Sequence, residues 1–212
     1  MKNYFFDLDG TLTEPEEGIT KCFIYALEKL KAPIPTQEEL RNLIGPPIQD
    51  SFFVLMNGNA ELAAQGLALY RERFSKIGLF ENYVYPDIPK LLGDLKTLGK
   101  NLYVATSKPH VYAIQILEHF QLAHYFVKIY GSELNGINAN KKDLLAFLLK
   151  SESLEAQNCV MIGDRNFDIL GAKANDIRSI GILWGHGSRE EHIQAGANHI
   201  VTTPSEILNI FQ

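Results

Sequence analysis

Hydrophobic residues along this chain occur in two alternating patterns. Short continuous runs rich in aromatic and β-branched residues, such as Tyr4–Phe6 and 101–106, are typical of strands buried in a sheet. Between such runs, hydrophobic residues recur every three or four positions, as at Ile88, Leu91 and Leu95, which is typical of amphipathic helices. The strands predicted in this way are 4–6, 101–106, 126–130, 158–162, 179–183 and 199–201, and the helices are 88–99, 111–120, 141–150 and 168–175, followed by a last helix that begins at Ser205.

Strands that alternate with helices form parallel sheets, because each helix carries the chain back across the sheet between two strands. The pattern therefore predicts an α/β fold with a Rossmann-like parallel sheet and helices on both of its faces. In such sheets, ligands bind at the carboxyl ends of the strands. We therefore expect functional residues directly after the strands.

Residues 15–83 interrupt this alternation. Hydrophobic residues such as Ile19 and Phe23 have helical spacing, and Thr36 with Glu39 forms a capping-box pattern at the start of another helix. No convincing strand occurs in this stretch, which we interpret as a helical insertion. The expected domains are a core of residues 1–14 and 84–212 and an inserted helical domain of residues 15–83.

The composition is that of an ordinary globular protein. Of the 212 residues, 46% are hydrophobic and 21% are charged, and the formal net charge is -5. A mildly acidic chain without a basic stripe argues against nucleic acid as a partner.

No hydrophobic run reaches the roughly 20 residues of a membrane-spanning helix, so we expect no membrane partner and a cytoplasmic protein. Cys22 and Cys159 lack metal-ligand spacing, and we expect them to be reduced thiols in the core.

Two aspartates directly follow the first predicted strand. Asp7 ends the run Tyr4–Phe6, and Asp9 stands two residues later, ahead of Gly10. In an extended segment, residues i and i+2 point to the same side, so we expect both carboxylates to face one small volume. Such a pair of anions is stabilised by a hard cation between them, Mg²⁺ being the usual choice. A surface turn is the alternative interpretation, but the preceding aromatic strand, with no matching second strand, favours an active-site edge.

Polar residues also follow two other predicted strands. Thr106 and Ser107 stand where the second strand ends and a helix is about to begin, so a hydroxyl and backbone amides can bind an anion there. A plain helix cap is the alternative interpretation of these two residues. Asp164 and Asp168 follow the fourth predicted strand, and we expect Asp164 to face the same volume as Asp7.

A lysine begins the predicted helix 141–150, although the helix dipole disfavours a cation at that end. A balance of charges explains its position. The four aspartates bring four negative charges and a phosphate dianion would bring two more, whereas Mg²⁺ and one lysine offset three. We therefore expect Lys141 to face the site and to stabilise the charge on transferring oxygens. A solvated pair with Lys142 is the alternative.

These motifs, in this order, resemble the four signatures of the haloacid dehalogenase-like hydrolase superfamily, and the likeness covers nearly the whole chain. The first signature is the run Asp7-Leu8-Asp9-Gly10-Thr11-Leu12-Thr13. Residues 81–86 and 171–175 look more narrowly like the phosphoglycolate phosphatase-like subgroup and related nucleoside monophosphate phosphatases. Asp87, Asn135 and Asp176 depart from the residues that are usual in that subgroup.

The resemblance implies a role for each of these residues. Asp7 would be the nucleophile that becomes phosphorylated, and Asp9 would be the acid and base. Lys141 would be the catalytic lysine of the third signature and would contact the substrate, while Thr106 and Ser107 would bind its phosphate. Mg²⁺ would be held by Asp7, Asp9, Asp164 and Asp168. The helical insertion corresponds to what the family calls a cap.

The function that the resemblance implies is that of a Mg²⁺-dependent phosphatase, phosphoglycolate phosphatase-like, acting on a small phosphomonoester as a monomer or homodimer. A nucleoside monophosphate phosphatase and a phosphosugar mutase are the alternatives within the family, because cap residues separate these activities. A metal-free dehalogenase fits less well, since Asp9 would place uncompensated charge beside the nucleophile. A phospho-receiver signalling domain uses similar residues, but it needs no such insertion and carries its acidic pair and phosphoacceptor on different strands.

Overall fold

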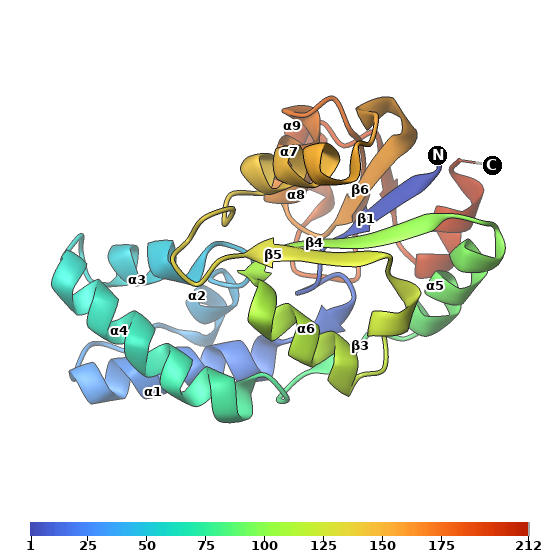
Figure 1. The fold of residues 1–212 in the computed structure, drawn as a ribbon. Helices are drawn as coiled ribbons and strands as arrows, with labels where there is room; N and C mark the ends of the chain where they lie inside the picture. The colour runs from blue at the N-terminus through green and yellow to red at the C-terminus, as the bar shows by residue number, and fades with distance from the viewer. Residues whose placement is uncertain (212) are drawn as a thin grey trace. The chain divides into compact units, whose positions relative to one another are not determined.

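The computed structural model describes residues 1–211 of the chain. They form two compact units, one made of residues 1–14 with residues 84–211 and the other of Pro15–Tyr83. The first unit contains a large sheet, whereas the second is helical (Figure 1). Two-residue strands, β2 (Thr13–Glu14) and β3 (Tyr83–Val84), stand where the chain passes from one unit to the other.

The first unit contains a six-stranded parallel sheet with the strand order β5-β4-β1-β6-β7-β8. Its strands are β1 (Asn3–Phe6), β4 (Asn101–Pro109), β5 (Lys128–Ser132), β6 (Cys159–Gly163), β7 (Arg178–Ile182) and β8 (His199–Val201). Because β1 lies between β4 and β6, the carboxyl ends of these three strands are neighbours (Figure 1). The predicted α/β fold with a parallel sheet is confirmed.

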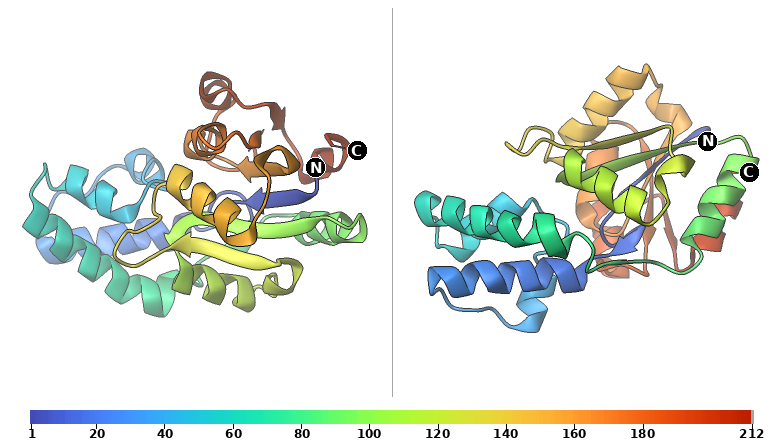
Figure 2. Two further views of the ribbon diagram at one scale, coloured as in Figure 1. Left: turned by 45° about the horizontal axis from the view of Figure 1, so that its top comes forward. Right: turned by 60° about the horizontal axis from the view of Figure 1, so that its bottom comes forward.

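Helices cover both faces of this sheet. They are α5 (Ile88–Thr97), α6 (His110–His119), α7 (Lys141–Glu152), α8 (Asn166–Lys173) and α9 (Arg189–Ala195), with short 3-10 helices at Ala123–Tyr125, Ala156–Asn158 and Pro204–Asn209. α7 and α8 pack on one face, whereas α5 and α6 pack on the other (Figures 1 and 2). α9 lies beside α8.

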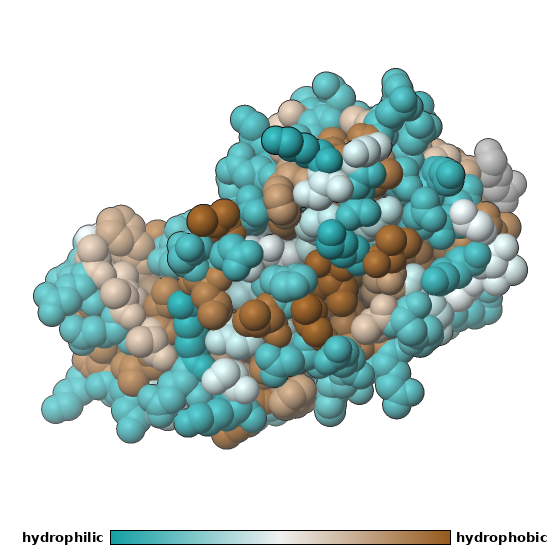
Figure 3. Space-filling model, in the orientation of Figure 1, coloured by the Kyte–Doolittle hydropathy of each residue, from teal (hydrophilic) through white to brown (hydrophobic). Residues whose placement is uncertain are grey.

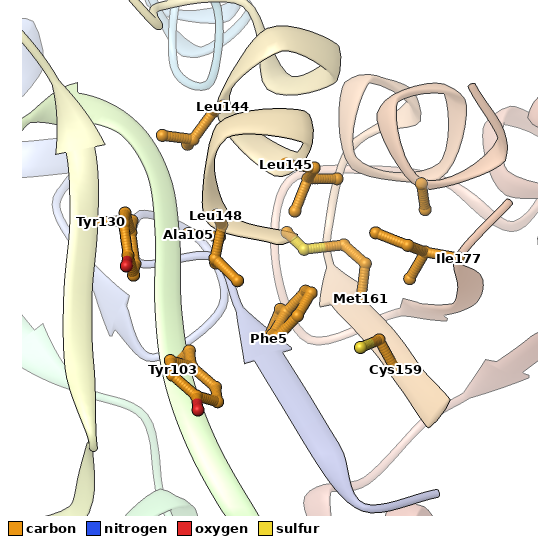
Figure 4. Packing of buried hydrophobic residues seen from close by; sticks show 11 residues of the cluster. Phe5, Tyr103, Ala105, Tyr130, Leu144, Leu145, Leu148, Cys159, Met161 and Ile177 are labelled. Carbon is orange, nitrogen blue, oxygen red and sulfur yellow. The ribbon is translucent and has the colours of Figure 1, made fainter. Parts of the chain in front are cut away.

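A hydrophobic cluster between the sheet and helices α7 and α8 holds β1 in place (Figure 4). Phe5 of β1 packs edge-on against Tyr103 of β4, with ring centroids 5.6 Å apart, and Met161 of β6 lies in the same cluster. The hydrogen bonds between β1 and β6 continue one residue past the end of β1, because the amide of Asp7 donates to the carbonyl of Ile162 at 2.9 Å. Packing of β1 therefore fixes the position of Asp7 at the edge of the sheet.

The second unit has a hydrophobic core of its own. Its helices are α1 (Glu16–Leu30), α2 (Gln37–Arg41), α3 (Ile48–Leu55) and α4 (Ala60–Arg73), followed by a π-helical turn at Phe74–Gly78. Phe23 packs against Phe52 and Tyr70, with ring centroids 5.0 and 5.1 Å away, and Tyr70 stacks on Phe74 at 5.3 Å. These aromatic contacts join α1, α3 and α4.

Several element boundaries differ from the predicted ones. β4 continues past the predicted end to Pro109, and the last element is a 3-10 helix that begins at Pro204. The capping box of Thr36 and Glu39 is present, but its helix is short and ends at Arg41. α9 was not predicted because few of its residues are hydrophobic.

The surface is mixed in character. Figure 3 shows hydrophilic residues over much of the visible face, with hydrophobic residues in smaller groups between them. Among the helices of residues 1–211, none combines the length and hydrophobicity that crossing a membrane requires.

Candidate active site

Asp7 stands directly after β1 and is held by two hydrogen-bonding groups. Its Oδ1 accepts from the backbone amide of Leu8 at 2.7 Å and lies 3.1 Å from Nζ of Lys141. The side chain is 9% exposed, so little of it is open to solvent. These contacts fix the orientation of the carboxylate at the carboxyl end of the central strand.

Asp164 follows β6 at the same edge of the sheet. Its Oδ2 accepts from the amide of His186 at 2.9 Å, and its Oδ1 accepts from the hydroxyl of Thr11 at 3.4 Å. Gly10 allows this close approach, because a Cβ at that position would lie 2.2 Å from Oδ2 of Asp164 and the φ of +78° disfavours other residues. The glycine of the first motif thus makes room for an aspartate 154 positions later in the chain.

Asp168 lies in the first turn of α8, where the helix dipole favours an anion. Its Oδ2 accepts from the backbone amide of Arg165 at 3.1 Å. Gly163 makes room for this carboxyl group, since a Cβ at position 163 would lie 2.1 Å from its Cγ. The turn between β6 and α8 thus points Asp168 back toward the end of the strand.

Asp7, Asp164 and Asp168 form an acidic triad. Their carboxylate oxygens lie within 4.8 Å of one another, and all three residues are buried. Burial, together with the neighbouring carboxylates, raises the pKa of Asp164 well above its ordinary range, and burial with the charge of Asp7 does the same for Asp168. Three hard oxygen donors that repel one another are a donor set suited to a cation such as Mg²⁺.

Lys141 is the first residue of α7, and its side chain reaches the triad. Nζ lies 2.7 Å from Oδ1 of Asp168 and 3.1 Å from Oδ1 of Asp7, and it donates to the carbonyl of Ala105 at 2.8 Å. Burial opposes the charge on this ammonium, but Asp168 and Asp7 outweigh burial and raise the pKa of Lys141. Its unusual position at the helix start therefore has a structural cause, and the sequence predicted this placement.

Thr106 and Ser107 lie in the last part of β4. Thr106 is buried, and its hydroxyl oxygen accepts from the backbone amide of Lys108 at 3.2 Å, which leaves its proton available to another acceptor. Ser107 is half-buried, and its carbonyl accepts from the hydroxyl of Ser132 on β5 at 2.8 Å. Both residues thus lie within β4, after the part that is paired with β1, whereas the strand was predicted to end at residue 106.

Asp9 is placed differently from the other aspartates. β1 ends at Phe6, so the chain bends before Asp9 and the alternation of an extended strand no longer applies. The carboxylate of Asp9 pairs with Lys108, with 2.6 Å between Oδ2 and Nζ. Burial and the charge of Asp7 raise the pKa of Asp9, while Lys108 opposes that rise. Asp9 is thus a neighbour of the triad rather than a fourth member of it.

Sequence reasoning gave no role to Lys108. For Trp184 and its neighbours in the loop after β7, it favoured a structural role over a place at the rim of the site. Lys108 stands two residues after Thr106, a spacing that signals a shared face only if the strand continues. In the loop, the indole of Trp184 donates to the carbonyl of Thr11 at 3.0 Å, and Nε2 of His186 lies 3.1 Å from Glu14 Oε1. These two residues, which showed no motif in the sequence, hold the segment that follows β1.

Comparison with known proteins agrees with this arrangement. Residues 4–182 match the family model described as haloacid dehalogenase-like hydrolase. A 5'-nucleotidase of Pseudomonas aeruginosa is 46% identical over 189 residues, covering 89% of this chain and 86% of the relative. The tyrosine-protein kinase PtkA of Mycobacterium tuberculosis is 36% identical over 202 residues, covering 95% of this chain and 68% of the relative.

The crystal structure of a predicted phosphatase from Clostridium acetobutylicum superposes with a TM-score of 0.94 at 43% identity, covering 99% of both chains. The match of the family model, the similarity of relatives over nearly the whole chain and the shared fold agree with one another. The chain belongs to the haloacid dehalogenase-like hydrolase family, as its motifs predicted.

Proposed function

We propose that this protein is a Mg²⁺-dependent phosphatase that hydrolyses small phosphomonoesters through a phosphorylated Asp7. The observation that carries the proposal is the contact of one buried lysine with two buried aspartates. Nζ of Lys141 lies 3.1 Å from Asp7 and 2.7 Å from Asp168. A fixed cation beside a carboxylate nucleophile suits the transfer of a phosphoryl group, because it stabilises charge on the oxygens during transfer.

The metal assignment is supported by the charge of the acidic triad. Asp7, Asp164 and Asp168 bring three buried carboxylates, whereas Lys141 supplies one positive charge. We propose that these three side chains hold Mg²⁺, with Asp9 next to them. When bound, the ion would offset the charge of the triad and of the phosphoryl oxygens. Burial and the neighbouring carboxylates raise the pKa values of Asp164 and Asp168, so a nearby cation would be needed to keep both groups ionised.

In the proposed first step, an oxygen of the Asp7 carboxylate attacks phosphorus, and the bond between phosphorus and the ester oxygen breaks. Protonated Asp9 gives its proton to the departing oxygen. Burial raises the pKa of Asp9 and so favours this protonated form. The hydroxyl of Thr106 and the backbone around Ser107 bind phosphate oxygens, and Lys141 stabilises their charge.

In the proposed second step, the carboxylate of Asp9 takes a proton from a water molecule, whose oxygen attacks phosphorus. The bond between phosphorus and Asp7 breaks and inorganic phosphate leaves. Asp7 is then a free carboxylate and Asp9 is again protonated. The two steps together therefore consume one water molecule and restore both aspartates.

We assign catalysis to the core of residues 1–14 and 84–212 and substrate selection to a cap of residues 15–83. The 46% identity to a relative named 5'-nucleotidase favours a nucleoside 5'-monophosphate as the substrate. Phosphoglycolate is the second candidate, because residues 81–86 and 171–175 resemble that subgroup. Both candidates are small phosphomonoesters, so the same chemistry serves either one.

The test is a set of steady-state rates on nucleoside 5'-monophosphates, phosphoglycolate and p-nitrophenyl phosphate, with Mg²⁺ and with excess chelator. We expect release of inorganic phosphate that needs Mg²⁺, with the highest kcat/KM on a nucleoside monophosphate. Full activity in chelator would overturn the metal assignment.

A parallel assay tests the reactions of other family members. It supplies labelled ATP with a tyrosine peptide, since one relative is named a tyrosine-protein kinase, and separately a labelled phosphosugar. We expect phosphate to go to water in both cases. Efficient transfer to tyrosine, or to another hydroxyl of the sugar, with slow release of phosphate would overturn hydrolysis as the function.

A further inference from the structure

Lys108 and Asp9 form a buried ion pair that the reaction described above does not use. Nζ of Lys108 lies 2.6 Å from Oδ2 of Asp9, and the two side chains are 5% and 13% exposed. An ion pair so far from solvent is weakly screened, and removal of one partner leaves the other buried without its counter-charge. The pair therefore restrains the position of the Asp9 carboxylate.

The backbone that carries Lys108 is itself held from two sides. The amide of Lys108 donates to Thr106 Oγ1 at 3.2 Å, and the carbonyl of Ser107 accepts from Ser132 at 2.8 Å. Gly131 of β5 packs directly against this segment, since a Cβ there would lie 2.6 Å from the carbonyl oxygen of Lys108. The pairing of β4 with β5 shifts register between Ala105 and Pro109, which places Lys108 in an irregular part of the strand. The backbone from which the Lys108 side chain extends is therefore held in place.

The two oxygens of Asp9 have different surroundings. Oδ2 is paired with Lys108, whereas Oδ1 is buried and has no hydrogen-bond partner within residues 1–211. A carboxyl group that transfers a proton needs one oxygen directed at the reacting atom, and an ammonium on the other oxygen prevents rotation of the group. The contact therefore leaves Oδ1 as the oxygen that can exchange a proton.

We propose that Lys108 is a positioning residue that orients Asp9 for proton transfer. This inference rests on the proposed function, in which Asp9 is the acid and base. Lys108 acts through Asp9, because its ammonium is in contact with the Asp9 carboxylate. Loss of Lys108 therefore slows the proton-transfer steps and leaves substrate binding unchanged.

The two chemical steps depend on Asp9 to different degrees when the leaving group is reactive. Formation of phospho-Asp7 from p-nitrophenyl phosphate needs little help from an acid, whereas attack by water still needs the base. A variant with a misplaced Asp9 should therefore release one equivalent of p-nitrophenolate rapidly and then turn over slowly. A role in binding would instead raise KM and give no such burst.

The experiment compares K108M, which removes the charge at similar length, with K108Q and K108R. K128M is the matched control, because Lys128 of the adjacent strand β5 pairs with Glu152 on α7 and is 55% exposed. With p-nitrophenyl phosphate, we expect K108M and K108Q to give a burst and to lower kcat at least about tenfold, since acid and base catalysis supplies roughly 10²–10⁴-fold. KM should fall with kcat and should not rise, because the phosphorylated enzyme accumulates. K108R should recover part of the loss, and K128M should behave as the wild type.

Circular dichroism verifies that each variant is folded, and K108Q carries the test if K108M does not fold. A wild-type kcat in the folded charge-free variant, or a rise in KM at unchanged kcat, would overturn the positioning role while leaving the proposed function in place. A wild type without phosphatase activity would overturn the proposed function, and this inference with it.

Discussion

At the scale of single residues, the candidate site concentrates negative charge where little solvent reaches. Asp7, Asp164 and Asp168 are all buried, and Lys141 is the ammonium in contact with two of them. Isolated carboxylates are expensive to bury, so this arrangement lowers the stability of the metal-free protein. Such a loss of stability in the metal-free protein is a common consequence of a site built for activity.

Replacement of Asp164 by Asn tests this cost. With excess chelator, we expect Asp164→Asn to raise the free energy of unfolding by about 1–2 kcal/mol, because an amide of the same shape removes one buried charge. Thermal unfolding in chelator and in Mg²⁺ measures the effect. Mg²⁺ should raise the Tm of the wild type more than that of the variant. A variant that is less stable than the wild type in chelator would contradict the account.

The stability of the metal-free protein should also depend on pH. Burial with neighbouring carboxylates raises the pKa of Asp164 to about 7, and burial with the charge of Asp7 raises the pKa of Asp168 to about 6. The folded state thus binds protons more tightly than the unfolded state. Protonation of these two groups therefore stabilises the folded state. This contribution to the free energy of unfolding is fully present below the ordinary pKa of Asp and is lost as pH rises toward about 7.

In chelator, therefore, the Tm of the wild type minus that of Asp164→Asn should fall between about pH 4 and pH 7. Thermal unfolding at a series of pH values gives this difference in Tm. Groups that titrate in the same way in both proteins change both Tm values equally and so do not affect the difference. A difference that is constant over this range would show that Asp164 titrates normally in the folded protein.

Asp7 carries the covalent step. Asp7→Asn should abolish turnover while the protein remains folded, because an amide neither attacks phosphorus nor balances the metal. Steady-state rates measure the loss, and Asp143→Asn, at an exposed position of α7, is the control. Retention of more than about a tenth of the activity, which is a barrier change below about 1.4 kcal/mol, would show that Asp7 is not the nucleophile.

At the scale of secondary-structure elements, the positions of residues directly after strands could be predicted, whereas those of residues within turns could not. Placement of Asp7 and Asp164 followed from the rule that residues after parallel strands meet at one edge. Placement of Lys141 followed from the balance of charges at the site. The position of Asp9 did not follow, because β1 ends at Phe6 and the turn after it breaks the two-residue alternation. The shape of such a turn depends on contacts with residues far away in the sequence, such as the hydrogen bond from Trp184 to the carbonyl of Thr11.

Lys108 and α9 show two further limits of prediction from a single sequence. Lys108 was missed because the strand was expected to end at residue 106, whereas pairing with β5 carries β4 on to Pro109. For α9, a usable signal exists, since Ser188 accepts from the amide of Glu191 at 3.1 Å in a Ser-x-x-Glu pattern. Hydrophobic spacing alone overlooks a short polar helix of this kind.

Within the helical unit, one ion pair ties the end of α4 to the chain that leaves the unit. Arg73 contacts both oxygens of Glu81, at 2.6 and 3.0 Å, and the side chains are 16% and 19% exposed. The hydrogen bonds from Arg73 lower the pKa of Glu81. Stability from this pair is therefore present above the ordinary pKa of Glu and is lost as pH falls through the lowered value.

We expect Glu81→Gln to lower the free energy of unfolding by about 1–3 kcal/mol near neutral pH, because it leaves a partly buried guanidinium without its carboxylate. The control is Asp94→Asn, which breaks the exposed pair of Lys90 and Asp94 on α5 and should leave the free energy of unfolding unchanged. Chemical denaturation of the two variants at pH 7 is the measurement. Equal effects of both substitutions would contradict a special role for Arg73 and Glu81.

At the scale of the whole molecule, the chain divides into a unit with the acidic triad and a helical unit with an aromatic core of its own. All residues of the cluster around Phe5 belong to the first unit, so its packing does not depend on residues 15–83. Separate cores are consistent with separate roles in chemistry and in substrate selection, as we propose. Closure of such a cap would also keep water from the nucleophile until substrate is bound.

Replacement of residues 15–83 by a short linker tests the division of roles. We expect kcat/KM for the best nucleoside monophosphate to fall far more than for p-nitrophenyl phosphate, whose reactive leaving group needs little help. Circular dichroism verifies that the remaining core is folded before the rates are compared. Equal losses on both substrates would show that the helical unit supports the fold and does not select the substrate.

The most direct test of the account is to trap the phosphorylated residue. Asp9→Asn should form phospho-Asp7 and hydrolyse it slowly, so the intermediate should accumulate when the variant is mixed with substrate and Mg²⁺. Acid quench, reduction of the acyl phosphate with borohydride and peptide mass spectrometry locate the modified residue. The account predicts modification at Asp7 in Asp9→Asn and none in a variant that also carries Asp7→Asn. Modification at another residue, or a variant that turns over without any trapped intermediate, would contradict it.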